Sequence, residues 1–204
     1  MLGIEDPGLM ERLLAPLGLS PESELVAYDS SGGLNAARLG WTLERFGFYK
    51  VRVLDGGLLG WLESGLPVSQ EVPEPGHGKL RLPEANSANC FTLAEVEQAL
   101  ANPEITFWDC RSGGEWRSGR IPGAQHLEWT ELLDETGRLL QPEGREEKLE
   151  RAGLATSDDI VVYCAGGIRA AHGYWVLRSM GYRRVRVFDG SWAQYESSGL
   201  PVES

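Results

Sequence analysis

The sequence has few of the residues that mark a disulfide framework or a structural metal site. It contains three cysteines and three histidines among 204 residues. None of the cysteines, Cys90, Cys110 and Cys164, lies in a CxxC pair or in a histidine-rich cluster with the spacing of a zinc site. The odd number also leaves at least one thiol unpaired. We therefore expect neither a disulfide framework nor a bound metal.

Basic residues and long apolar runs are also scarce. The chain has 19 lysines and arginines against 30 aspartates and glutamates, a formal net charge of −11. Nucleic acids and anionic membrane surfaces bind basic faces, so we expect neither as a main partner. No apolar run approaches the roughly 20 residues of a membrane span. The start MLGIEDPGLMERLL has no basic region and no apolar core of a signal peptide. We expect a cytoplasmic protein that binds anions through local groups.

A long internal repeat is present. Residues 25–68, which begin LVAYDSSGG, align with residues 160–202, which begin IVVYCAGG. Tyr28 corresponds to Tyr163, and after one residue is dropped from the second loop the match continues to the shared ending SGLPV. The sequence therefore predicts two copies of one structural unit.

Each copy has the same order of predicted elements. An apolar strand, LVAY or IVVY, is followed by a glycine-containing loop, a helix over roughly 34–46 or 168–180, and a second strand, VRV. Strands that alternate with helices are typical of a parallel sheet with helices on both faces. We predict an α/β fold with two three-layer α/β/α units, each built on a parallel sheet.

The two copies differ in extent. Only the second is preceded by a further block, about 89–141, with a predicted helix CFTLAEVEQAL, a strand ITFWDC, and a loop with a short strand in RSGGEWRSGRIPGAQHLEW. The segment between the copies is rich in proline, glycine and polar residues. We predict a partial unit over 1–70, a linker over 71–88 and a complete unit over 89–204.

Cys164 lies between the strand IVVY and the loop AGGIR, which leads into a helix. The small residues of the loop allow successive backbone N–H groups to turn toward one anion, and the helix start adds the positive end of its dipole. An arginine at the end of the loop can add charge-assisted hydrogen bonds. Such a cradle favours the thiolate form of a cysteine. The candidate residues of this cradle are Ala165, Gly166, Gly167, Ile168 and Arg169.

An isolated cysteine at a strand end is more commonly an inert buried thiol. The first copy argues against that interpretation, because it keeps the strand and the helix but has Asp29 at the position of Cys164. A cysteine that only packs would be replaced by another apolar residue rather than by a carboxylate. We therefore predict that the loop faces solvent in both copies, and that only the unit with Cys164 is catalytic.

Together these motifs resemble the rhodanese-like sulfurtransferases, specifically tandem-domain proteins with an inactive first domain. DCR with EWRSGRIPGA resembles the first-strand motif of that family and the element after it, VVYCAGGIRA resembles its active loop, and VRVFDGSWAQYESSGLPV resembles its domain ending. The resemblance implies a ping-pong reaction. Cys164 would take a sulfane sulfur from a small donor such as thiosulfate, hold it as a persulfide, and pass it to cyanide or a thiol. No cofactor or metal is implied.

The loop length separates possible chemistries. From Cys164 to Arg169 the pattern is Cys-x4-Arg, similar to the rhodanese loop and one residue shorter than the Cys-x5-Arg loop of related tyrosine phosphatases. Sulfur transfer is therefore favoured over phosphate hydrolysis. Two alternatives stay open, a persulfide relay for a partner protein and a 3-mercaptopyruvate sulfurtransferase. The well-studied two-domain members have an arginine where this chain has Glu115.

Supporting candidates lie in the further block of the second copy. We expect Asp109 and Arg111 mainly to hold neighbouring loops by hydrogen bonds. Arg120 either presents its guanidinium near the mouth of the pocket or is a solvated surface residue. Cys110, after the strand ITFW, is predicted to be a core residue.

Overall fold

A computed structural model describes residues 6–20, 22–72, 74–76 and 80–204. The N-terminal elements are α1 (Pro7–Leu14), the 3-10 helix η1 (Ala15–Leu17), β1 (Leu25–Ala27), α2 (Leu34–Arg45), β2 (Val51–Val53) and α3 (Gly57–Glu63). The C-terminal elements are β3 (Cys90–Phe91), α4 (Leu93–Ala99), β4 (Ile105–Asp109), α5 (Gly113–Ser118), β5 (Gln125–His126), the 3-10 helix η2 (Trp129–Leu132), α6 (Pro142–Arg151), β6 (Asp159–Tyr163), α7 (Ile168–Ser179), β7 (Val185–Phe188) and α8 (Ser191–Glu196).

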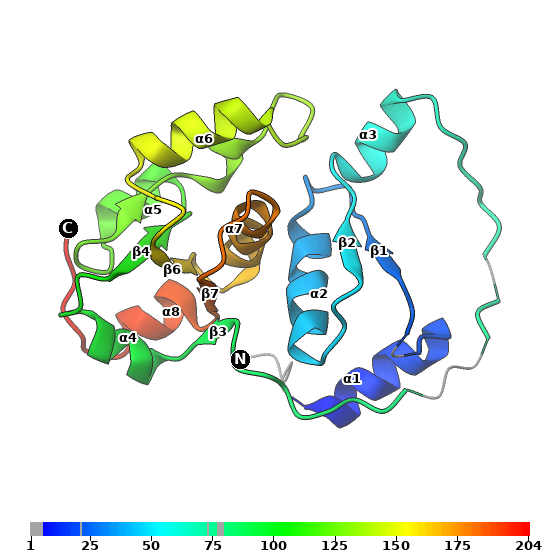
Figure 1. The fold of residues 1–204 in the computed structure, drawn as a ribbon, viewed down its shortest axis with the longest axis horizontal. Helices are drawn as coiled ribbons and strands as arrows, with labels where there is room; N and C mark the ends of the chain where they lie inside the picture. Colours follow the sequence, from blue (N-terminus) through cyan, green and yellow to red (C-terminus); the bar gives the residue numbers. More distant parts are fainter. Residues whose placement is uncertain (1–5, 21, 73, 77–79) are drawn as a thin grey trace.

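The strands form two sheets in which every pair is parallel. One sheet has two strands in the order β1-β2, and the other has five in the order β3-β7-β6-β4-β5. The two sheets lie on opposite sides of the helix pair α2 and α7 (Figure 1). Parallel sheets joined by helices confirm the predicted α/β class, and α2 and α7 coincide with the helices expected after the two loops.

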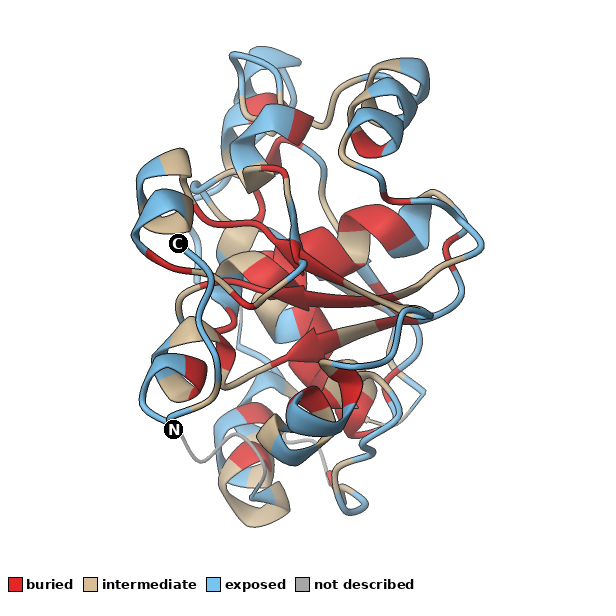
Figure 2. Ribbon diagram, turned by 90° about the vertical axis from the view of Figure 1, so that its left-hand side faces the viewer, coloured by how far each residue is buried: buried red, intermediate tan, exposed pale blue. Residues whose placement is uncertain are grey.

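Helices cover both faces of the five-stranded sheet. In the central strand β6, Ile160 and Val162 belong to the core cluster that includes residues of α6 and α7, whereas Val161 and Tyr163 belong to the cluster with residues of α4 and α8. These four residues are completely buried, and Figure 2 shows the strands at the centre of the molecule coloured mostly as buried. Burying each aliphatic side chain stabilises the folded state by about 1.5–3 kcal/mol relative to leaving it exposed. The alternation produces the predicted three layers and makes β6 a rigid support for the loop that follows it.

The two-stranded sheet is covered by helices on one face. Met10 and Leu14 of α1 and Leu43 of α2 pack there in a separate core cluster. On the opposite face Val26 and Tyr28 are 54% and 61% exposed, although their counterparts in β6 are completely buried. The first copy thus has the strand and helix pattern of the second with fewer strands and fewer covering layers.

The helices α2 and α7, which are equivalent in the repeat, pack directly on each other (Figure 1). Gly40 of α2 allows close approach, because a Cβ atom at this position would lie 2.8 Å from the indole ring of Trp175. The hydroxyl of Tyr174 donates a 2.6 Å hydrogen bond to Glu44 across the same contact. The helix that starts at the Cys164 loop is therefore held in part by the other unit.

Two elements differ from the sequence-based expectation. Residues 113–118 form α5 rather than a loop, because Ser112 and Glu115 make a reciprocal capping box at its first turn. Cys90 and Phe91 form an edge strand beside β7 rather than the start of a helix, since Thr92 caps α4 one residue later.

The predicted linker 71–88 includes residues 73 and 77–79, which lie outside the described residues. Its described part places Leu80 in the core beside α1. Across the described ranges, no helix is both long and apolar enough to cross a membrane.

Candidate active site

Cys164 lies at the carboxyl end of β6, directly before α7. Only 1% of its surface is exposed, so the loop shields the sulfur although Gly166 and Ile168 of the same loop are exposed. The backbone N–H of Gly167 donates to the Cys164 Sγ at 3.1 Å. Gly167 has a φ of 88°, a left-handed conformation that favours glycine and turns this N–H toward the sulfur. The loop thus faces solvent as predicted, while the Cys164 sulfur is enclosed.

The surroundings of Cys164 stabilise its thiolate. Burial opposes ionisation, but hydrogen bonds from the Cys110 thiol and from the backbone N–H groups of Ala170 and Gly166, with the positive charge of Arg169, lower its pKa to about 5. Burial and the neighbouring Cys164 raise the pKa of Cys110 well above its usual range. At neutral pH the Cys164 sulfur is therefore a thiolate, whereas Cys110 stays a thiol, and its Sγ donates to the carbonyl of Tyr163 at 3.1 Å. Cys110 is completely buried, which confirms its predicted core position.

Ser191 is a site residue that the sequence analysis missed. Its hydroxyl accepts a 3.1 Å hydrogen bond from the backbone N–H of Cys164, donates to the carbonyl of Phe188 at 2.8 Å, and lies 3.9 Å from the Cys164 Sγ. Ser191 is completely buried and has a φ of 50°, rare for a residue with a Cβ atom. The repeat contained one signal for a special backbone position here, because the first copy has a glycine, Gly57, where the second has Ser191. In the structure Gly57 adopts a similar φ of 52°.

Backbone hydrogen bonds from the start of α8 fix the Cys164 loop further. The N–H of Trp192 donates to the carbonyl of Cys164 at 2.9 Å, and the N–H of Ala193 donates to the carbonyl of Ala165 at 3.0 Å. Because these carbonyls are held outward by α8, the N–H groups of the loop remain turned toward the sulfur. The cradle is therefore organised before any ligand enters.

Arg169 forms a two-pronged ion pair with Glu115 at the start of α5. Its Nη1 and Nη2 atoms lie 2.8 Å from the Oε2 and Oε1 atoms of Glu115. This hydrogen bonding raises the pKa of Arg169, and with the Ser112 hydroxyl it lowers the pKa of Glu115 to about 2. The guanidinium of Arg169, which the sequence predicts as an anion-binding group, is thus already paired with the Glu115 carboxylate.

The equivalent loop of the first copy holds a carboxylate of its own. Asp29 accepts four backbone hydrogen bonds, from the N–H groups of Ser31 (2.7 Å), Gly33 (2.9 Å), Asn35 (2.8 Å) and Ala36 (2.9 Å). Burial raises its pKa, but these bonds outweigh that effect and lower it overall. In this fold, the backbone N–H groups of the loop between strand and helix therefore bind an anion. In the first copy that anion is the carboxylate of Asp29.

The first copy also reaches the Cys164 loop. Arg38 of α2 forms a 2.5 Å ion pair with Asp189 and lies 3.4 Å from the carbonyl of Gly167. Both side chains are mostly buried, with 15% and 18% of their surfaces exposed. A side chain from the other unit therefore borders the backbone of the cradle.

Asp109 and Arg111 form a buried ion pair with Nη2 to Oδ2 at 2.6 Å, and the same Nη2 donates to the carbonyl of Gly119 at 2.6 Å. Arg120 pairs with Glu203 near the C-terminus and packs over the ring of Trp116 at 4.5 Å. The structure thus brings together Cys164 and residues 165–169, and it places the other three candidates around the neighbouring segments.

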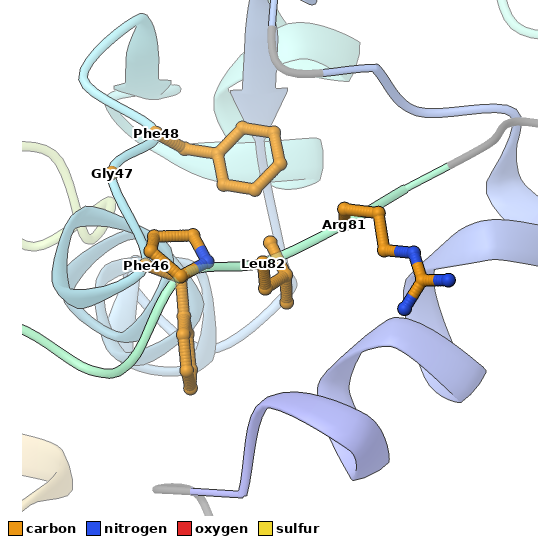
Figure 3. A pocket seen from close by; sticks show the side chains of 6 residues that line it. Phe46, Gly47, Phe48, Arg81 and Leu82 are labelled. Carbon is orange, nitrogen blue, oxygen red and sulfur yellow. The ribbon is translucent and has the colours of Figure 1, made fainter.

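No group of three or more metal-ligating side chains is found in the described part of the chain. One surface hollow of about 170 Å³ lies at the end of α2, lined by Phe46, Gly47, Phe48, Arg81, Leu82 and Pro83 (Figure 3). None of these residues belongs to the Cys164 loop, and the hollow contains no nucleophile.

Comparison with known proteins identifies the family. The rhodanese-like domain matches residues 3–64 and 92–198. A thiosulfate sulfurtransferase from Azotobacter vinelandii is 32% identical over 206 residues, which cover 95% of this chain and 74% of that protein. A thiosulfate sulfurtransferase from Pseudomonas aeruginosa is 30% identical over 212 residues, 97% and 78% of the two chains. The sulfur carrier protein TtuD from Thermus thermophilus is 28% identical, over 94% and 74%.

Solved structures show the same fold. The wild-type structure of EanB matches with a TM-score of 0.84 and 21% identity over 98% of this chain, and YnjE matches with a TM-score of 0.85 and 22% identity over 98%. The chain spans about half of those two solved chains, 54% and 53%. With the domain match and the curated relatives, these findings confirm the resemblance seen in the motifs: the chain belongs to the family of proteins with the rhodanese-like domain.

Proposed function

We propose that this protein is a sulfurtransferase that moves a sulfane sulfur from thiosulfate, or a similar donor, to cyanide or a thiol acceptor through a persulfide on Cys164. The observation that carries the proposal is the buried Cys164 sulfur, which receives backbone hydrogen bonds and has a pKa lowered to about 5. A thiolate at neutral pH is the reactive form of cysteine toward sulfur.

In the first half-reaction, the Cys164 thiolate attacks the outer sulfur of thiosulfate. A new S–S bond forms, the original S–S bond breaks, and sulfite leaves with the electron pair, so that a Cys164 persulfide anion remains. In the second half-reaction, cyanide attacks the terminal sulfur, thiocyanate leaves, and the thiolate is restored. The N–H groups of the loop suit a persulfide anion, as the four donors around the Asp29 carboxylate illustrate.

Intact-mass measurement after thiosulfate treatment tests the proposal. The wild type should gain the mass of one sulfur atom, release sulfite and form thiocyanate on addition of cyanide. Cys164→Ser should do none of these, whereas Cys90→Ser, which changes a thiol in β3, should behave as the wild type. A Cys164→Ser variant that still gains sulfur and turns over thiosulfate would refute the role of Cys164.

One observation supports a second candidate, a persulfide relay that receives sulfur from a partner protein. It is the 28% identity to a protein named as a sulfur carrier. In that case Cys164 would be loaded by a persulfide-bearing donor protein while free thiosulfate turned over negligibly. Comparing the rates of sulfur gain from the two donors distinguishes the candidates.

A further inference from the structure

The guanidinium of Arg169 is paired with Glu115 through both of its terminal nitrogens. Both terminal nitrogens of Arg169 bind the two carboxylate oxygens at 2.8 Å. Glu115 is itself held, because its Oε2 accepts from the Ser112 hydroxyl at 2.8 Å and from the Ser112 backbone N–H at 3.0 Å. This carboxylate stays charged through the neutral pH range, since its pKa is about 2. The pair is therefore a fixed part of the surroundings of the Cys164 loop.

The charges next to the sulfur do not balance. The Cys164 thiolate and Glu115 each contribute one negative charge and Arg169 one positive charge, whereas Asp109 with Arg111 and Arg38 with Asp189 form closed pairs. The site therefore carries about one net negative charge before a donor enters. A like charge a few ångströms away disfavours binding, and each further charge on the donor adds to the cost.

We propose that Glu115 determines which sulfur donors the site accepts: by neutralising Arg169, it favours donors with a single negative charge, such as organic thiosulfonates, over the dianion thiosulfate. This inference rests on the proposed function and names the donor class of the same site. The Glu115 carboxylate binds Arg169 and Ser112 rather than the Cys164 sulfur. It is a positioning and specificity residue that acts through Arg169.

Two donors with the same reacting bond isolate the effect of charge. Thiosulfate transfers its outer sulfur to the Cys164 thiolate and releases sulfite. Methanethiosulfonate transfers its terminal sulfur to the same thiolate and releases methanesulfinate. In both reactions one S–S bond to Cys164 forms, one S–S bond in the donor breaks, and the leaving anion takes the electron pair, so neither needs an oxidant or reductant. The donors differ by one unit of charge.

The experiment measures kcat/KM for both donors with a common acceptor, cyanide, in the wild type and in Glu115→Gln. Glutamine at this position can still complete the capping box with Ser112, so α5 should be retained. Removing one negative charge from the site should raise the ratio of thiosulfate to methanethiosulfonate kcat/KM about tenfold. Glu115→Ala provides a second variant with the same expected direction.

The chain contains a matched control in Glu95. It occupies the same third position of a capping box, with Thr92, at the start of another short helix, α4. Glu95→Gln removes the same charge from an equivalent local structure that is not in contact with Arg169, so the donor ratio should stay at its wild-type value. A general loss of stability or of surface charge would change both glutamine variants alike.

The outcomes separate the two proposals. If both donors load Cys164 but Glu115→Gln and Glu115→Ala leave the ratio unchanged, or change it as much as Glu95→Gln does, the inference fails and the proposed function stands. If neither donor loads Cys164 in the wild type, the proposed function fails and the inference fails with it. A ratio that rises only in the Glu115 variants supports both.

Discussion

At the scale of single residues, the lowered pKa of Cys164 predicts how its reactivity depends on pH. Only the thiolate is alkylated, so the rate with iodoacetamide should rise as pH increases through about 5 and be constant near neutrality, whereas an ordinary cysteine has its midpoint near about 8.5. Following the rate by mass spectrometry checks this, with Cys164→Ser as the control that assigns the label. A midpoint near that of a free cysteine would contradict the stabilised thiolate.

Two neighbouring glycines of the loop should respond differently to alanine. In Gly167→Ala, with a φ of 88°, the new Cβ atom would lie 2.5 Å from the Asp189 Oδ1, so we expect a loss of about 1–3 kcal/mol in the free energy of unfolding together with loss of sulfur transfer. Gly166→Ala is the matched control, because no atom lies within 4 Å of its Cβ position. Urea unfolding and thiocyanate formation measure both effects. Equal behaviour of the two variants would show that loop geometry does not set activity.

At the scale of elements, the sequence predicted the Cys164 loop because its requirements are local. A nest of N–H groups needs small residues in a fixed order between a strand and a helix, and the repeat with Asp29 displayed the same loop with a different anion. Helix α5 was missed although Ser112 and Glu115 have the spacing of a capping box, since the glycines between them indicated a loop. Local patterns therefore predict the cradle better than its short flanking helices.

Contacts between segments that are far apart in the chain could not be predicted from the sequence. Glu115 and Arg169 are 54 positions apart, and they meet because α5 and α7 both begin near the carboxyl ends of the adjacent parallel strands β4 and β6. Ser191 reaches the cradle from the end of β7, the other neighbour of β6. Predicting these partners needs the strand order 7-6-4, which no motif in the sequence states. The cysteine loop was thus predictable from the sequence, but the distant groups that set its charge environment were not.

Because α2 and α7 pack closely at Gly40, adding one methyl group there should lower the stability of the protein substantially. In Gly40→Ala, the Cβ atom would lie 2.8 Å from the ring of Trp175, and the resulting overpacking should cost about 1–3 kcal/mol despite the better helix propensity of alanine. Gly144→Ala in α6 is the control, because its nearest neighbour, the Leu140 Cβ, would be at an ordinary 3.7 Å. This control should be neutral or stabilising by about 0.5–1 kcal/mol. Urea midpoints compare the two, and a stable Gly40→Ala would show that the helix contact is loose.

At the scale of the whole molecule, the repeat places equivalent residues in reciprocal positions. Arg38 in the first copy corresponds to His172 in the second. Arg38 lies against Gly167 in the loop of the second copy, and His172 lies against Gly33 in the loop of the first, where a Cβ atom would be 3.8 Å from its ring. Each unit therefore borders the anion cradle of the other. The first copy is therefore placed to influence the Cys164 loop through direct contact.

The last prediction tests this influence through Arg38. Arg38→Ala leaves the Asp189 carboxylate unpaired beside the Cys164 loop, where its negative charge disfavours the thiolate. We expect the pH midpoint of Cys164 alkylation to move upward from about 5, and sulfur transfer to fall at pH values near and below that midpoint. In Arg38→Ala with Asp189→Asn, which removes both charges, the midpoint should return toward the wild-type value.

Arg52→Ala is the control within the same unit, because Arg52 pairs with Glu24 on the surface, where 71% and 66% of the two side chains are exposed. Such pairs contribute little to stability, so both alkylation and turnover should be unchanged. If Arg38→Ala alters the unfolding midpoint while the pH midpoint of Cys164 stays in place, the first unit serves the fold alone. If the pH midpoint moves in Arg38→Ala and returns in the double variant, the first unit acts on the nucleophile through the charge that Arg38 neutralises.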